Sequence, residues 1–162
     1  MLYLVTTNTH KFLEAKSVLG EFGIKVEQIK DEKYEGKELS LQEVSESNAK
    51  SFFEKYKKPV CVDDTGVFFR AYPNFPGNHP KLIFNMLGYK GLLKLLENEN
   101  REAYFRSVVS YFDGKNLKTF SGELDCAVDT KVQDFDKDVL PYERILLING
   151  KPISSLSRDE KN

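Results

Sequence analysis

Short apolar runs alternate with stretches of helical periodicity over the first 63 residues, and that alternation limits the possible folds more than any other feature. Apolar residues recur every three or four positions from Phe12 to Phe22, which is the spacing of an amphipathic helix. Ser40 can cap a second helix, with Glu43 as its capping-box partner. We expect strands over residues 2–6, 24–29 and 59–63, a first helix that includes the apolar residues from Phe12 to Phe22, and a second helix over residues 40–56. This alternation is typical of an α/β domain.

The second half of the chain is richer in hairpin signals. A helix over residues 82–97, with a break at Gly88, precedes two long strands over residues 104–112 and 117–129. The tetrapeptide Asp113-Gly114-Lys115-Asn116 between these strands is a typical hairpin turn. A late apolar run over residues 145–148 ends at an Asn-Gly turn. We therefore expect a mixed sheet within a single domain spanning residues 1–162.

Charge and hydropathy exclude several classes of protein. The chain has 24 Lys and Arg against 25 Asp and Glu, so it lacks the basic field that nucleic-acid binding usually needs. No apolar run approaches the roughly 18–20 residues of a membrane span. The N-terminus has no basic region and turns polar at Thr6, unlike a signal peptide. We expect a cytoplasmic protein with no nucleic-acid or membrane partner.

The polar segment Thr6-Thr7-Asn8-Thr9-His10-Lys11 lies between the first strand and the first helix. Unpaired amides and the helix dipole favour an anion at a helix N-terminus. The hydroxyl and amide groups add hydrogen-bond donors, and Lys11 adds a full charge one turn into the helix. The segment indicates an anion site, although an ordinary helix cap followed by a surface lysine fits the same pattern.

The segment Asp63-Asp64-Thr65-Gly66 follows a buried apolar run, where α/β sheets usually place their ligands. We expect the strand to end here in a turn. Carboxylates suit Mg²⁺, which typically takes one or two of them together with substrate phosphates. Side chains alternate along a strand, so the two carboxylates should diverge. A plain turn or helix cap is the alternative interpretation.

Glu43 and Glu46 lie three residues apart on the second predicted helix, hence near one face. A solvated helix face is the simpler explanation, and Glu43 already has a capping role. His10 and His79 are the only histidines, and neither has cysteine or histidine at zinc-ligand spacing. No nucleophilic triad is evident. The carboxylates and Lys11 are therefore the main candidates for chemistry.

Taken in order, these segments resemble the signatures of one family. The first resembles Thr-Gly-Asn-x-x-Lys, with Thr7 in place of Gly, and the second, over residues 43–50, is an acidic helix ending in Asn-Ala. Residues 62–68 resemble the third, Asp/Glu-Asp-Ser/Thr-Gly, and a Pro-Gly pair follows at residues 76–77. The chain is thus similar to the inosine triphosphate pyrophosphatase (Ham1-like) family of non-canonical purine nucleotide pyrophosphatases.

The resemblance implies an α/β fold in which an elongated mixed β-sheet is flanked by helices, with two lobes and a central cleft. It also implies a homodimer that uses Mg²⁺ to hydrolyse ITP, dITP or XTP to the monophosphate and pyrophosphate. Lys11 and Asp64 would be catalytic, and Glu43 and Asp64 would bind Mg²⁺. The residues that would bind the substrate are Thr6, Thr7, Asn8, Lys11, Thr65, Tyr142, Glu143 and Lys161.

The second half departs from the family pattern. Residues 139–143 stand where the family has Gly-Phe-Gly-Tyr-Asp, so Tyr142 is kept and Glu143 replaces Asp. Lys161 matches a nucleotide-binding lysine, but the Ser-His-Arg motif and the last helix of the family fold are missing. The alternative expectation is a nucleotide-binding homologue with impaired catalysis or relaxed base selection. A truncated form of an ordinary active enzyme is a third interpretation.

Overall fold

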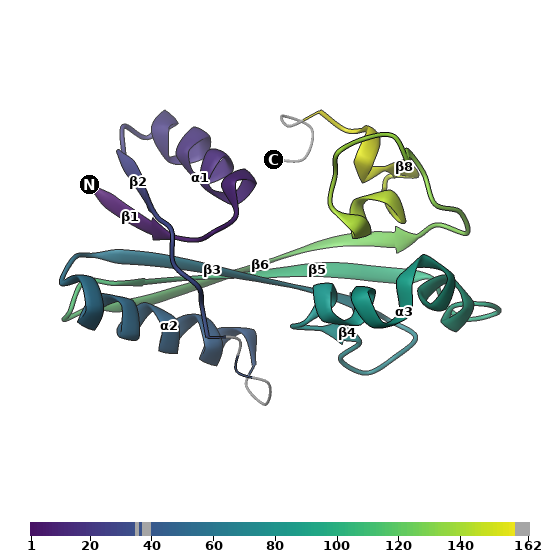
Figure 1. The fold of residues 1–162 in the computed structure, drawn as a ribbon, viewed down its shortest axis with the longest axis horizontal. Coiled ribbons are helices and arrows are strands. Elements are labelled where there is room, and N and C mark those ends of the chain that lie inside the picture. Colours follow the sequence, from purple (N-terminus) through teal and green to yellow (C-terminus); the bar gives the residue numbers. More distant parts are fainter. Residues whose placement is uncertain (35, 37–39, 158–162) are drawn as a thin grey trace. The chain divides into compact units, whose positions relative to one another are not determined.

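The computed structural model describes residues 1–34, 36 and 40–157. It contains three α-helices, eight strands and two short 3-10 helices among these residues (Figure 1). In chain order they are β1 Leu2–Val5, α1 Thr9–Glu21, β2 Val26–Ile29, α2 Leu41–Tyr56, β3 Val60–Phe69, β4 Pro76–Gly77, α3 Pro80–Leu95, β5 Glu102–Phe112, β6 Leu117–Val128, η1 Pro141–Arg144, β7 Leu146–Ile148, β8 Lys151–Pro152 and η2 Ile153–Ser155.

The strands form a mixed sheet, which confirms the predicted α/β class. The strand order is β2-β1-β3-β5-β6-β7-β8, with β4 paired to β3 outside this path. β1 pairs in parallel with both β2 and β3. The β3–β4, β6–β7 and β7–β8 pairs are antiparallel. The chain divides into two compact units, residues 1–65 with 107–122 and residues 66–106 with 123–162. The central cleft stays a prediction.

In the first unit, α1 and α2 cover opposite faces of the sheet (Figure 1). Alternation along the strands explains this arrangement, because successive side chains point to opposite faces. Leu4 and Cys61 pack on the face that receives Phe12 and other α1 residues. On the other face, Ala49 and Phe52 of α2 pack against buried strand residues, which are Val5 of β1 and Val60 and Val62 of β3.

The second unit has its own hydrophobic core. Leu92 and Leu96, from α3 and the residue that ends it, are fully buried there. Gly88 interrupts α3 with φ of 60°, as its sequence position predicted. The remaining buried residues of this core come from the strands and the late segment: Val67, Phe69, Ala103, Val128, Tyr142, Ile145, Leu146 and Ile153. No helix in the described part of the chain is both long and apolar enough to cross a membrane.

The prediction that a strand ends at Asp63 was wrong. β3 runs on through Asp64, Thr65 and Gly66 to Phe69. Pairing explains the extension, because Val67 and Phe68 of β3 lie opposite Gly77 and Pro76 of β4. Asp63 and Asp64 therefore lie in the middle of a strand and not in a turn. Strand geometry directs these adjacent side chains to different partners.

The helix boundaries agree with their sequence signals. Asn8 caps α1, and Gly23 follows its end with φ of 71°. Ser40 and Glu43 form the predicted capping box at the start of α2. The turn between β5 and β6 falls on residues 113–116, as expected. Local chemistry is thus sufficient to place the ends of these elements.

Candidate active site

The loop after β1 is held by its own side chains. Thr6 is buried, and its hydroxyl accepts a hydrogen bond from the Asn8 amide at 3.1 Å. The Asn8 side-chain oxygen accepts from the amides of His10 at 2.9 Å and Lys11 at 3.3 Å. Thr7 between them is exposed. This geometry fixes the start of α1 and places Lys11 in its first turn.

Two lysines meet the adjacent carboxylates of β3. Lys11 Nζ lies 2.6 Å from Asp63 Oδ2, and Lys33 Nζ lies 2.6 Å from Asp64 Oδ1. Lys33 Nζ also donates to the backbone carbonyl of Asp63. All four side chains are less than one-third exposed, with 27% and 17% for the first pair and 19% and 17% for the second. The divergence predicted for Asp63 and Asp64 thus gives each carboxylate its own cation.

Thr65 links this cluster to β5. Lys11 Nζ donates to Thr65 Oγ1 at 3.4 Å, and Thr65 Oγ1 lies 2.8 Å from Ser107 Oγ. Lys11 therefore touches both a carboxylate and a hydroxyl that come from alternate positions on one face of β3. Of the residues predicted from the sequence, the structure links Thr6, Asn8, Lys11 and Thr65 through hydrogen bonds. Lys11 also pairs with Asp63, the residue before Asp64 in β3.

Two buried carboxylate oxygens in this cluster have no hydrogen-bond partner among the described residues, Asp63 Oδ1 and Asp64 Oδ2. A buried acceptor without a partner is costly in a structural role and is a usual feature of functional sites. Burial raises the pKa of the Asp64 carboxyl, although Lys33 and Lys11 act in the opposite direction. A raised carboxyl pKa suits a group that accepts a proton from water near neutral pH.

Glu43 is engaged elsewhere. Its Oε2 accepts hydrogen bonds from the Ser40 amide at 2.8 Å and the Ser40 hydroxyl at 2.7 Å. These bonds lower the pKa of the Glu43 carboxyl, and the side chain is exposed. Glu46, one turn on, accepts from Thr119 at 2.9 Å and from Gln42 at 2.8 Å. The capping explanation for Glu43 is confirmed, and its role as a metal ligand stays a prediction.

The donor set does not fit a divalent metal held by the protein alone. Among the described residues, no three His, Cys, Asp or Glu side chains are grouped closely enough to hold one. Asp64 Oδ1 already faces an ammonium group, and the Glu43 carboxylate is occupied by Ser40. The partnerless oxygen Asp64 Oδ2 fits a cation that arrives with further ligands of its own. Mg²⁺ bound to substrate phosphates has that form.

Two residues predicted to bind the substrate, Tyr142 and Glu143, lie in the second unit. Tyr142 is 7% exposed, packs in the core and donates its hydroxyl to the Pro80 carbonyl at 3.0 Å. Burial raises the pKa of the Tyr142 hydroxyl. Glu143 lies in η1, with its amide bonded to the Leu140 carbonyl at 3.0 Å. Lys161 lies outside the described residues. The substrate contacts of these three residues therefore stay predictions.

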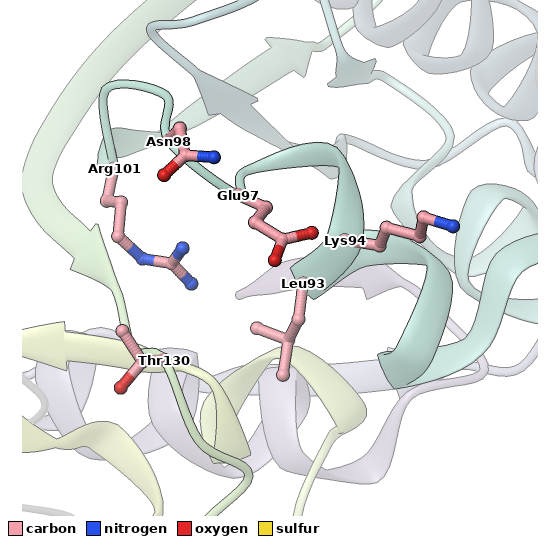
Figure 2. Close-up of a pocket in the computed structure, with 6 residues that line it drawn as sticks. All are labelled: Leu93, Lys94, Glu97, Asn98, Arg101 and Thr130. Atoms are coloured by element: carbon pink, nitrogen blue, oxygen red, sulfur yellow. The ribbon is translucent and has the colours of Figure 1, made fainter.

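A pocket of about 440 Å³ lies in the second unit (Figure 2). Figure 2 shows the Arg101 side chain reaching across it, whereas Lys94 extends away from the opening. The Arg101 guanidinium donates to three backbone carbonyls, those of Leu96, Val128 and Asp129, at 2.5–2.9 Å. Its charge is thus used to join two chain segments. The pocket includes none of the site residues predicted from the sequence, and we do not assign the chemistry to it.

Sequence reasoning missed three contributors to the cluster. Lys33 lies in a charged loop that shows no motif, and Ser107 lies within an unremarkable strand. Asn48 is buried on α2, and its side chain bonds both the amide and the carbonyl of Tyr34, the residue after Lys33. Only Asn48 had a sequence signal, because it belongs to the Asn-Ala pair at the end of the second signature.

Comparison with known proteins identifies the family of this chain. The sequence pattern of the Ham1 family matches residues 2–162. A dITP/XTP pyrophosphatase of Saccharolobus solfataricus is 33% identical over 165 residues, covering 98% of this chain and 83% of the relative. The protein of the same name from Thermococcus kodakarensis is 37% identical over 164 residues, covering 99% and 88%.

Solved structures show the same fold. A HAM1 protein from Coxiella burnetii superposes with a TM-score of 0.79 at 18% identity, covering 100% of this chain and 90% of that one. The Ham1 protein of Staphylococcus aureus gives a TM-score of 0.70 at 18% identity, covering 98% and 88%. At such low identity the superposition establishes the fold alone. Because the family pattern spans nearly every residue, this chain belongs to the Ham1 family.

Proposed function

We propose that this protein is a nucleoside triphosphate pyrophosphatase that hydrolyses the non-canonical purine nucleotides dITP, XTP and ITP to the monophosphate and pyrophosphate. The observation that supports this function most strongly is that Lys11, in the first turn of α1, contacts Asp63 and Thr65 of β3, while its charge also acts on the pKa of Asp64 between them. The names of the S. solfataricus and T. kodakarensis relatives point to the same substrates.

Cleavage of a phosphoanhydride needs in-line positioning and charge neutralisation more than covalent chemistry from the protein. Asn8 and Lys11 would hold the triphosphate at the start of α1, where the helix dipole favours an anion. Thr6 and Thr7 would shape this loop and complete the phosphate contacts. Thr65 would touch the nucleotide through a hydroxyl that Ser107 holds at 2.8 Å.

Asp64 would orient the attacking water and accept its proton. Its Oδ2 has no hydrogen-bond partner in the described part of the protein, and burial raises the pKa of the carboxyl. The water oxygen would form a bond to the α phosphorus as the bond from that phosphorus to the bridging oxygen breaks, so that pyrophosphate leaves. The proton lost by the water would pass to the Asp64 carboxylate. Lys11, in contact with neighbouring Asp63, would offset the negative charge on the leaving group.

Mg²⁺ is proposed as part of the substrate, as a complex with the triphosphate, in which it neutralises phosphate charge. Asp64 Oδ2 is the protein oxygen proposed to face it. Glu43 stays a proposed second contact, which requires its carboxylate to leave Ser40. Removal of divalent ions with a chelator should therefore stop pyrophosphate release.

Base selection separates this function from the alternative of a homologue with impaired catalysis or relaxed selection. A 6-oxo purine presents an acceptor where adenine presents an amino donor, and a mismatched buried group costs about 1–3 kcal/mol. The test is pyrophosphate release from dITP, XTP, dATP and dGTP with Mg²⁺. Preference for dITP and XTP supports the proposal, equal rates support relaxed selection, and nucleotide binding by calorimetry without turnover supports impaired catalysis.

The resemblance also implies a homodimer with a purine nucleoside triphosphate as ligand, and the charge and hydropathy of the chain favour a cytoplasmic protein with no nucleic-acid or membrane partner. We include these properties in the proposal. Light scattering in solution should then give twice the chain mass of 18.6 kDa. A value equal to the chain mass would remove the dimer from the proposal without affecting the reaction.

A further inference from the structure

Lys33 pairs with Asp64, the carboxylate proposed to face the cation that arrives with the substrate. Its ammonium group contacts Asp64 Oδ1 at 2.6 Å and also donates to the Asp63 carbonyl. The Lys33 side chain is 19% exposed, so much of its length is removed from water. Burying a lysine to this degree is unusual unless its charge is paired. The pairing here is with the carboxylate proposed to perform the chemistry.

The segment that contains Lys33 is attached to α2 on both sides. Before it, Asp31 bonds Lys55 at 2.5 Å and the Tyr56 hydroxyl at 2.8 Å. After it, the Asn48 side chain accepts from the Tyr34 amide at 2.9 Å and donates to the Tyr34 carbonyl at 2.8 Å. A backbone held at both ends in this way directs the intervening side chain toward β3. The contact with Asp64 is therefore built into the fold.

An ammonium and a divalent ion compete for the same carboxylate. An opposite charge within about 4–6 Å changes the affinity of a carboxyl for a proton by roughly 10- to 1000-fold. The positive charge of Lys33 likewise repels a metal ion that approaches Asp64 while Lys33 remains in place. A triphosphate relieves it, because its oxygens offer the ammonium a new set of acceptors.

We propose that Lys33 is a built-in counter-ion that prevents divalent metal from binding at Asp64 in the free protein and moves onto the phosphates when the metal–nucleotide complex enters. The inference rests on the proposed function, since it assigns Asp64 to the reaction. It makes Lys33 a positioning residue that couples metal binding to nucleotide binding. Metal and nucleotide then bind together, and the metal alone does not pair with Asp64 in the free protein.

The test measures metal binding directly, with Mn²⁺ as the probe and electron paramagnetic resonance as the readout. The full-length wild type is compared with Lys33→Met and with the control Lys30→Met, which removes an exposed lysine from the same loop. Without nucleotide, wild type should bind Mn²⁺ weakly, because no three metal-ligating side chains are grouped among the described residues, and Lys33→Met should bind it about tenfold more tightly, the lower end of the electrostatic range. Lys30→Met should equal wild type. Equal affinity in all three proteins overturns the proposal.

A second arm uses wild type alone and so does not depend on how the variant folds. Adding a nonhydrolysable α,β-imido analogue of dITP should tighten Mn²⁺ binding by more than the analogue's own affinity for the ion explains. Wild type that binds Mn²⁺ equally well without the analogue contradicts the proposal. In the first arm, the further variant Lys33→Arg keeps the charge. Without nucleotide it should therefore bind Mn²⁺ as weakly as wild type does.

The two proposals fail separately. If dITP gives no pyrophosphate but Lys33→Met still tightens Mn²⁺ binding, the counter-ion role stands and the substrate assignment is wrong. If dITP is hydrolysed while all variants bind Mn²⁺ alike, the reaction stands and the role of Lys33 is wrong.

Discussion

At the scale of single residues, Asp64 combines burial, a raised pKa and an oxygen without a partner among the described residues. We expect Asp64→Asn to lower turnover of dITP by about 10²–10⁴-fold, the usual contribution of a positioned general base. The change keeps the shape of the side chain, so thermal unfolding should shift little. Asp125→Asn is the control, because Asp125 pairs with Arg70 on the surface and is 82% exposed. Retained turnover in Asp64→Asn would exclude Asp64 as the base.

Lys11 is tested by removing its charge. Lys11→Met should lower kcat/KM for dITP by about 10- to 100-fold, because a hydrogen bond to a charged group contributes about 1.5–3 kcal/mol. The matched control is Lys16→Met, since Lys16 is exposed and follows on the same helix. Steady-state kinetics on the folded variants provides the comparison. An unchanged kcat/KM in Lys11→Met would contradict a role in phosphate binding.

Single residues also show where sequence reasoning stops. Lys11, Asp63 and Asp64 could be identified because each lies beside an element boundary or a buried apolar run. Lys33 could not, because its partner Asp64 is 31 residues away and the loop between β2 and α2 has no periodicity. A contact of this kind depends on tertiary packing, which brings α2 beside β3 through the bond from Ser45 to the Val62 carbonyl at 3.3 Å.

At the scale of elements, Gly66 allows β3 to pass close to β4. A Cβ there would lie 2.7 Å from the Phe68 ring and 2.9 Å from the Gly77 carbonyl oxygen. We expect Gly66→Ala to destabilise the protein by about 1–3 kcal/mol, the range for overpacking, as measured by denaturant unfolding. Gly122→Ala is the control, because a Cβ at Gly122 meets nothing within 4 Å. Equal stabilities of the two variants would contradict this reading of Gly66.

The β5–β6 turn should make stability depend on pH in acid. Asp113 accepts hydrogen bonds from the amides of Lys115 at 2.9 Å and Asn116 at 2.7 Å, and bonds with Asn116 lower its pKa from 3.8 to about 2. A lowered folded-state pKa stabilises the protein fully above about pH 4, and this contribution disappears as pH falls toward 2. Thermal melts of wild type and Asp113→Asn should therefore converge over that interval. Parallel curves would contradict it.

Element boundaries were predictable where a cap, break or turn residue marks them, as at Ser40, Gly88 and Asp113. The end of β3 was not predictable, because Asp63-Asp64-Thr65-Gly66 has the composition of a turn. Pairing of Val67 with Gly77 overrides that local preference, and the partner lies ten residues further along the chain. Strand length depends on such partners more than on propensity.

At the scale of the whole molecule, the order of the signatures identified the family and its α/β fold. The division into two compact units does not follow from composition, because β3, β5 and β6 each run from one unit into the other. The phosphate-binding candidates lie in the first unit, and Tyr142 and Glu143 lie in the second. Chemistry on the phosphates and recognition of the base are thus assigned to separate parts of the chain.

The most direct test of the whole proposal is the identity of the products. ³¹P NMR of dITP incubated with the protein and Mg²⁺ should show the triphosphate signals replaced by pyrophosphate and a nucleoside monophosphate in equal amounts. Formation of orthophosphate together with a diphosphate, or dITP left unchanged while the protein remains folded, would contradict it.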